Sequence, residues 1–189
     1  MSSYYLTPLN NYVCKRINHR SIKDYEEDIK YIFYSTSSIK SFKDNDHKQS
    51  FYDNWTKYYF SDNPVSVWVA LDEKNRVLSY LTGSLNSHHA STFFNPRIKS
   101  YKIFSHQFDQ FPAHFHINTS PEAQRRGIGK QLIDHFCKEL LFKGIPGVHI
   151  ITTRDAENIF FYQKNHFIYS DEQTFNNTTL YFMGRKLTS

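Results

Sequence analysis

The sequence predicts one α/β domain built on a mixed sheet of six or seven strands, with helices on both faces. Its length of 189 residues is typical of a single domain. Residues 113–152 run as strand, helix and strand, the order that gives a parallel pair with a right-handed crossover. Residues 65–71 and 77–85 are β-rich runs on either side of five polar residues, which predicts an antiparallel hairpin. A sheet that holds both kinds of pair is mixed.

The first 60 residues read as one strand followed by two helices. Residues 12–17 alternate apolar and polar side chains, as a half-buried strand does. Ser21 is a suitable N-cap, and the acidic residues in the turn after it favour a helix over 21–35. Aromatic side chains spaced along one face predict a second helix over about 46–60.

The segment 86–111 has aromatic residues in no clear period. We interpret it as an insertion or a lid. Three roles stay open for it: covering a binding site, forming the contact of a homodimer, or only covering the sheet.

The C-terminal half has stronger periodicity than the rest of the chain. A run of apolar residues at helical spacing lies between two short β-rich runs, and a hairpin turn at Asn176–Asn177 joins the last two strands. The predicted elements are a strand at 113–118, a helix at 129–142, a strand at 148–152, a helix at 157–164, and strands at 167–175 and 178–183.

Composition narrows the class of protein. Hydrophobic residues make up 39% of the chain and aromatic residues 17%, so a packed core is expected. The net charge of +5 is spread along the chain and forms no footprint for nucleic acid. No run of 18 apolar residues and no secretion signal is present, so we expect a soluble, cytoplasmic protein that binds neither nucleic acid nor membrane. Cys14 and Cys137 are then reduced thiols.

The turn between the strand at 113–118 and the helix at 129–142 contains glycines and basic residues that could bind a ligand. Gly127 and Gly129 allow backbone N–H groups to approach a ligand at a helix N-terminus, where negative charge is favoured. Arg125, Arg126 and Lys130 add positive charge there. The pattern predicts a phosphate cradle, although it is neither the dinucleotide fingerprint nor the P-loop. A tight turn without a ligand is the structural alternative.

Two motifs at this spacing resemble one family. Gln124-x-x-Gly127-x-Gly129 resembles the acyl-CoA-binding motif of the GNAT superfamily of N-acetyltransferases. Tyr162-x-Lys164, followed by Asn-His-Phe, resembles the Tyr-x-Lys-x-Gly-Phe segment of that family. The order of elements fits over nearly the whole chain, with residues 113–168 as the specific part. The resemblance implies a GNAT-like acyl-CoA N-acyltransferase fold in one domain, 1–189.

The resemblance also implies a co-substrate and the residues that bind it. Acetyl-CoA is the expected acetyl donor, with its pyrophosphate on the glycine turn and its pantetheine arm along the strand at 113–119, and no metal is expected. The implied binding residues are Ile117, Asn118, Thr119, Gln124, Arg125, Arg126, Gly127, Ile128, Gly129, Lys130, Asn158, Phe161, Tyr162 and Lys164.

The implied reaction is direct attack by a primary amine of a small molecule or peptide in a ternary complex. Tyr162 is the expected general acid for the leaving thiolate, and a backbone N–H near Thr119 is expected to stabilise the oxyanion. The base is open between His116, Asp155 and a chain of water molecules. In this family the acceptor pocket forms near residues corresponding to 31–51 and 170–179.

Several departures from the family keep other functions open. His166 stands where the family usually has glycine, and the fourth strand offers His114 and His116 where a Glu is often found. That strand also resembles the acetyltransferase-like domain attached to some O-GlcNAc hydrolases. The alternatives are a catalytically silent acetyl-CoA-binding module and a protein that binds another phosphate ligand or nucleic acid. His114, His116 and His149 could supply half a zinc site, but no Cys or carboxylate completes a recognisable spacing.

Overall fold

The structure is a computed structural model that describes most of the chain. The described residues are 3–9, 22–61 and 67–187. Contacts divide the chain into two compact units. Unit 1 comprises Met1–Thr82 and His116–Asp134, and unit 2 comprises Gly83–Phe115 and His135–Ser189. The single domain over 1–189 remains a prediction.

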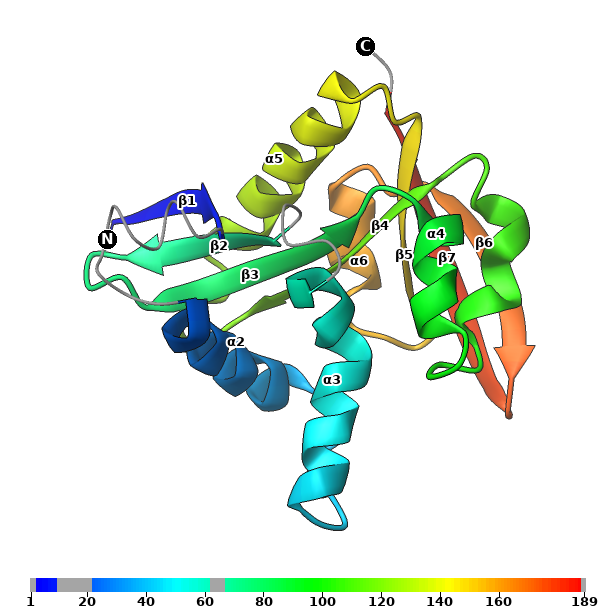
Figure 1. The fold of residues 1–189 in the computed structure, drawn as a ribbon. Coiled ribbons are helices and arrows are strands. Elements are labelled where there is room, and N and C mark those ends of the chain that lie inside the picture. The colour runs from blue at the N-terminus through cyan, green and yellow to red at the C-terminus, as the bar shows by residue number, and fades with distance from the viewer. Residues whose placement is uncertain (1–2, 10–21, 62–66, 188–189) are drawn as a thin grey trace. The chain divides into compact units, whose positions relative to one another are not determined.

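The described residues contain seven strands and seven helical segments, joined by turns and loops (Figure 1). The strands are β1 (Tyr4–Pro8), β2 (Val67–Asp72), β3 (Val77–Ser84), β4 (Ala113–Thr119), β5 (Gly147–Thr153), β6 (Tyr169–Phe175) and β7 (Thr178–Lys186). The α-helices are α2 (Ile22–Thr36), α3 (Asn45–Ser61), α4 (Ser87–Phe94), α5 (Ile128–Phe142) and α6 (Ile159–Lys164). The 3-10 helices are η2 (Tyr101–Gln107) and η3 (Pro121–Ala123).

The strands form one sheet in the order β1-β2-β3-β4-β5-β7-β6. β4 pairs with β5 in parallel, whereas β1–β2, β2–β3, β5–β7 and β6–β7 are antiparallel. The predicted mixed sheet flanked by helices is therefore confirmed, and so is the parallel pair on either side of α5.

Unit 1 holds the N-terminal strands and the first two helices. The predicted hairpin is β2–β3, and Asp72 closes its turn by accepting hydrogen bonds from the backbone N–H of Lys74 and of Arg76, both at 2.9 Å. α2 and α3 lie on one side of β2 and β3 (Figure 1). α2 buries Tyr25, Ile29 and Ile32, which recur at the spacing of one helix face.

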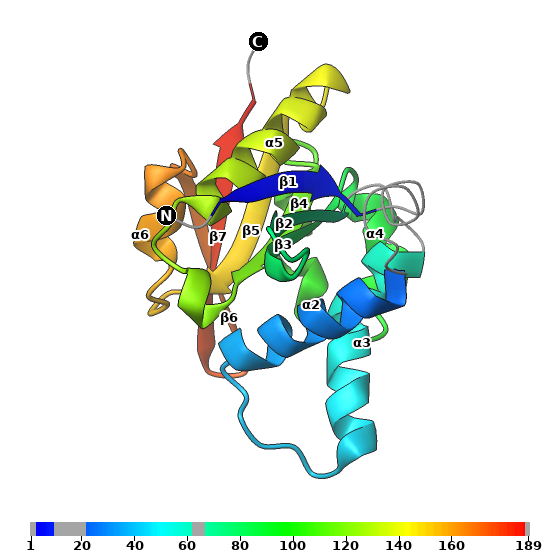
Figure 2. The same cartoon turned by 90° about the vertical axis from the view of Figure 1, so that its left-hand side faces the viewer.

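Unit 2 has a core of aromatic side chains. Phe104, Phe111 and Phe182 are fully buried and pack together. In Figure 2, α4 and α6 lie on opposite sides of β5 and β7. The segment 86–111, interpreted as an insertion or lid, forms α4 and η2, and the Phe94 ring stacks on that of Tyr101 at 4.9 Å. Of its aromatic residues, Phe94, Phe104, Phe108 and Phe111 are buried in the core of this unit, which favours the role of covering the sheet.

Some sequence predictions need correction. The expected strand at 12–17 and the expected N-cap Ser21 lie outside the described residues, and β1, which was not expected, occupies Tyr4–Pro8. The last strand was expected to end at 183, but β7 continues to Lys186. A Cβ at Gly184 would lie 2.7 Å from the ring of Phe111, so only glycine fits at this position of the strand. The last two strands are joined, as predicted, by two asparagines with left-handed φ.

Among the described helices, none is both long and apolar enough to cross a bilayer.

Candidate functional site

The turn between β4 and α5 in unit 1 contains two left-handed residues and leads directly into a helix N-terminus. Arg125 and Gly127 have left-handed φ values of +61° and +78°, and α5 begins at Ile128. Left-handed residues that alternate with ordinary ones turn successive N–H groups inward, and a helix N-terminus adds free N–H donors. The turn is therefore built to bind an anion.

Three positively charged side chains lie at this turn, and they differ in how far other groups of the protein already contact their charge. Lys130 Nζ lies 2.5 Å from Asp134 Oδ2, so part of its charge is already compensated. The guanidinium of Arg126 lies 5.8 Å from the ring centre of Tyr4. Arg125 is exposed and forms no ion pair with any described residue. Gln124 Nε2 donates to the Thr119 carbonyl at 3.4 Å, which ties the two ends of the turn together.

The end of β4 is held by neighbours in unit 1. Ser79 Oγ donates to the Asn118 carbonyl at 2.9 Å and lies 2.7 Å from Thr119 Oγ1. The side chain of Asn118 donates to the Tyr80 hydroxyl at 2.8 Å and accepts from Thr36 Oγ1 at 3.1 Å. Asn118, expected to bind the cofactor, thus has its side chain committed within the protein, and the strand backbone is what remains for a ligand. Ile117 beside it is half-buried.

A cavity of about 190 Å³ lies between α2, α3 and the strands β3 and β4 of unit 1. Its ring-bearing lining residues are Phe33, Phe51, Trp55, Tyr80 and His116. Its hydroxyl and amide lining residues are Thr36, Ser37, Ser38, Thr56, Thr82 and Asn118.

His116, one of the expected bases, forms part of that cavity wall. Its ring meets those of Trp55 and Tyr59 edge-on, with centroid distances of 5.4 and 5.9 Å. Burial lowers its pKa to about 4. The imidazole is therefore neutral at pH 7, but it is a weak proton acceptor, because a general base works best with a pKa near the working pH.

Tyr162, the expected general acid, lies on α6 in unit 2. Its side chain is 7% exposed, and its ring packs edge-on against Phe161 and Phe167. Burial raises the pKa of its hydroxyl, so the phenol keeps its proton at neutral pH. The hydroxyl has no hydrogen-bond partner among the described residues, which leaves it available to a ligand.

The other expected residues of unit 2 surround α6. Asn158 is the N-cap residue of α6, and its side chain accepts from Thr152 Oγ1 at 3.2 Å. Lys164 Nζ lies 4.4 Å from the ring centre of Phe160, and Phe161 is half-buried. Asp155, the other expected base, is exposed in the turn after β5.

His166, where the family usually has glycine, adopts a left-handed φ of +67°. It follows Asn165, the C-cap of α6, and the next N–H, that of Phe167, donates back to the Tyr162 carbonyl at 3.1 Å. A left-handed residue at this point is typical of a helix C-terminus and explains why glycine is favoured there.

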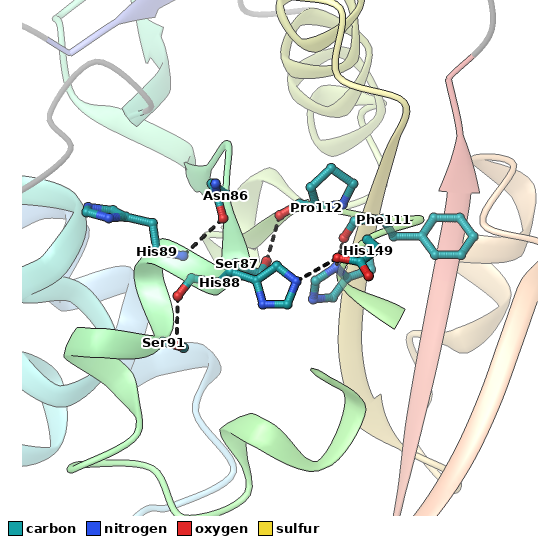
Figure 3. A network of polar contacts seen from close by, with 9 residues as sticks. Asn86, Ser87, His88, His89, Ser91, Phe111, Pro112 and His149 are labelled. Atoms are coloured by element: carbon teal, nitrogen blue, oxygen red, sulfur yellow. Dashed lines mark hydrogen bonds and ion pairs between the residues drawn. The ribbon is translucent and has the colours of Figure 1, made fainter. Parts of the chain in front are cut away.

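Two of the three histidines considered for zinc, His114 and His149, have protein partners in unit 2. His149 Nδ1 donates to the Phe111 carbonyl at 2.7 Å, and His114 Nδ1 lies 2.7 Å from Ser87 Oγ. Figure 3 shows His149 directed at Phe111, and Ser87 directed at the carbonyl of Pro112. The residues described here contain no group of three His, Cys, Asp or Glu side chains that could hold a metal ion.

Sequence reasoning missed Trp55 and Thr56 of α3 and Tyr80 and Thr82 of β3, whereas Phe51 of α3 falls within the range 31–51 expected for the acceptor pocket. All eight residues of β3 are buried, so in the sequence Tyr80 and Thr82 are indistinguishable from ordinary core positions. One signal was available, because Trp55 lies among the aromatic residues that predicted α3. Thr82 Oγ1 and Ser120 Oγ are buried and have no hydrogen-bond partner in the described structure.

Comparisons with known proteins agree with this fold. A family model described as acetyltransferase (GNAT) domain matches residues 63–169. The crystal structure of SsHAT is similar with a TM-score of 0.73 and 16% identity, over 99% of this chain and 100% of that chain. A chain of the NatC complex, solved bound to Gag peptide and CoA, is similar with a TM-score of 0.63 and 12% identity, over 98% and 99%. An agmatine N-acetyltransferase variant has a TM-score of 0.60 and 10% identity, over 97% and 99%.

Proposed function

The chain belongs to the acetyltransferase (GNAT) family, and on this premise we propose that it transfers the acetyl group of acetyl-CoA to a primary amine. The acceptor is the amine of a small molecule or a peptide. The observation that carries the proposal is the turn before α5, where Arg125 and Gly127 are both left-handed and a helix N-terminus follows.

That turn suits the pyrophosphate of the donor. Its N–H groups are preorganised, so binding requires little reordering of the backbone. The exposed Arg125 and the partly compensated Lys130 supply charge at the edge of the turn. A structural neighbour was solved with CoA, which supports an acyl-CoA as the ligand.

The strand β4 suits the amide-containing arm of the donor. Its parallel pairing with β5 in unit 2 runs over Ala113–Val148 and His114–His149, at the start of a seven-residue strand. A strand whose pairing stops early offers N–H and C=O groups to the amides of a ligand. The expected oxyanion donor near Thr119 belongs to the same strand.

Tyr162 is the general acid of the proposal. In transfer from a thioester, the amine nitrogen forms a bond to the carbonyl carbon as the C–S bond breaks. The amine loses a proton and the leaving thiolate gains one. A phenol whose pKa is raised by burial stays protonated until the thiolate forms, and the partner-free hydroxyl of Tyr162 meets that requirement.

Removal of the amine proton is assigned to water or to Asp155 in preference to His116. The carboxylate of Asp155 is exposed, whereas the imidazole of His116 is a weak base at a pKa of about 4. His116 in this proposal shapes the acceptor cavity.

Two measurements test the function. Calorimetric titration with acetyl-CoA should give micromolar binding, with ATP at least about tenfold weaker because it lacks the pantetheine arm. No binding at high micromolar acetyl-CoA would reject the donor. The rate of thiol release from acetyl-CoA is then measured with polyamines, aminoglycosides, amino acids, arylalkylamines and lysine peptides. At least one of these classes should raise the rate above that without an amine. Donor binding without thiol release from any class would favour the catalytically silent acetyl-CoA-binding module.

A further inference from the structure

The cavity of unit 1 has aromatic walls and no formal charge. Phe33 and Phe51 face it together with Trp55. Of the described residues that line it, none is Asp, Glu, Lys or Arg. Its size of about 190 Å³ exceeds the roughly 150 Å³ of an apolar cavity that accepts benzene, so one ring with a short side arm fits.

The environment of this cavity disfavours positive charge. Transfer of an ammonium group from water into a site without a counter-ion is strongly unfavourable. His116 in the wall already shows this effect, because burial alone lowers its pKa to about 4. An acceptor with a second ammonium group would leave that group unpaired in the cavity. The same environment holds a single reacting amine toward its neutral form, which is the nucleophile.

Among the buried side-chain polar atoms of the described wall, one has no hydrogen-bond partner. Thr82 is 1% exposed, and its Oγ1 makes no hydrogen bond in the described structure. The nearby polar groups are engaged: Thr36 and Asn118 bond to each other, and Thr56 Oγ1 donates to the Tyr52 carbonyl at 2.7 Å. A buried hydroxyl without a partner is unfavourable, and a polar group of a ligand would relieve that penalty.

From the aromatic wall, the uncharged lining and the unpartnered Thr82 hydroxyl, we infer that the acceptor is a compact arylalkyl monoamine that binds in the α2–α3 cavity. It is neither a polyamine nor a basic peptide. This inference rests on the proposed function, since it names the acceptor class of that reaction.

Binding and turnover separate the inference from the proposed function. The chain has two tryptophans, so a Trp68→Phe variant leaves Trp55 as a fluorescent reporter in the cavity. Titration with 2-phenylethylamine, without any acetyl donor, should change the fluorescence of Trp55. The dissociation constant from this titration should be at least tenfold lower than the constants for putrescine or a lysine peptide. Thiol release with acetyl-CoA should follow the same order in kcat/KM.

A matched pair of variants tests the role of Thr82. Thr82→Val should weaken binding of 2-phenylethylamine about tenfold without lowering Tm, because it removes a hydroxyl that is unpaired in the protein alone. Thr7→Val makes the same change at a buried threonine of β1 that does not line the cavity, and should leave that affinity unchanged. Equal affinities in the two variants would remove the role of Thr82.

The outcomes are distinguishable. Acetylation of putrescine or the lysine peptide at rates equal to 2-phenylethylamine overturns the inference and leaves the proposed function standing. Binding of 2-phenylethylamine with no thiol release from any amine rejects the proposed function and retains the ligand class of the cavity. Failure of 2-phenylethylamine to bind rejects the inference whatever the turnover.

Discussion

Gly127 and Gly144 share one backbone conformation, with left-handed φ values of +78° and +70°, and a Cβ built on either would meet nothing within 4 Å. Gly127 lies in the turn proposed to bind the pyrophosphate, whereas Gly144 follows α5. Gly127→Ala should therefore lower the free energy of unfolding by about 1 kcal/mol through backbone strain and also weaken acetyl-CoA binding at least about tenfold. Chemical denaturation and calorimetry measure the two effects.

Gly144→Ala is the control for that prediction. It introduces the same strain and should lower stability by a similar amount, about 1 kcal/mol, but leave the affinity for acetyl-CoA unchanged. Equal losses of affinity in both variants would show that Gly127 acts only through stability.

Tyr162→Phe tests the acid role of the buried phenol. The variant keeps the ring that packs against Phe161 and Phe167 and removes only the hydroxyl. We expect kcat to fall by about 10², with the affinity for acetyl-CoA within twofold of the parent, because a general acid acts at the transition state. Steady-state kinetics and calorimetry check this. Tyr169→Phe, another tyrosine of unit 2, is the control and should leave kcat unchanged, and a parent-like kcat in Tyr162→Phe would remove the role.

His166→Gly should stabilise the protein. The left-handed φ of +67° strains a residue with a Cβ by about 1–2 kcal/mol, while glycine adds about 0.5–1 kcal/mol of entropy to the unfolded chain. The expected net gain is about 0.5–1 kcal/mol by chemical denaturation. His166→Ala removes the same exposed side chain but keeps the Cβ, so it should give no gain. A gain in both variants would assign the effect to the side chain instead of the backbone.

The glycine turn could be predicted from the sequence because its determinants are local. Gly127, Arg125 and the start of α5 lie within a few residues of one another, and the backbone conformation follows from those residues. The same is true of the two asparagines between β6 and β7 and of the hairpin around Asp72. Local signals of this kind do not depend on packing elsewhere in the chain.

The cavity of unit 1 could be predicted only in part. Its lining residues Phe33, Thr36, Ser37, Ser38 and Phe51 fall within the range 31–51 expected for the acceptor pocket. The others come from later in α3 and from β3 and β4, and nothing local in the sequence joins them to that range. Thr82 in the fully buried β3 differs from a core residue only in lacking a partner for its hydroxyl, which is a fact of packing. Asn118 shows the opposite case. Its place beside the motif suggested cofactor binding through the strand backbone, which stays a prediction, while the long-range hydrogen bonds of its side chain to Tyr80 and Thr36 are visible only in the structure.

The low pKa of His116 predicts a pH dependence of stability. Burial lowers this pKa from 6.5 to about 4, so between these values the unfolded chain takes up a proton that the folded protein does not. The stabilising contribution is complete above pH 6.5 and is lost as the pH falls toward 4. At about 1.4 kcal/mol for each pH unit, the loss approaches about 3 kcal/mol. The free energy of unfolding, measured by urea denaturation at several pH values between 4 and 6.5, should change with a shallower slope in His116→Gln than in the parent. A parent-like slope in His116→Gln would place the titrating group elsewhere.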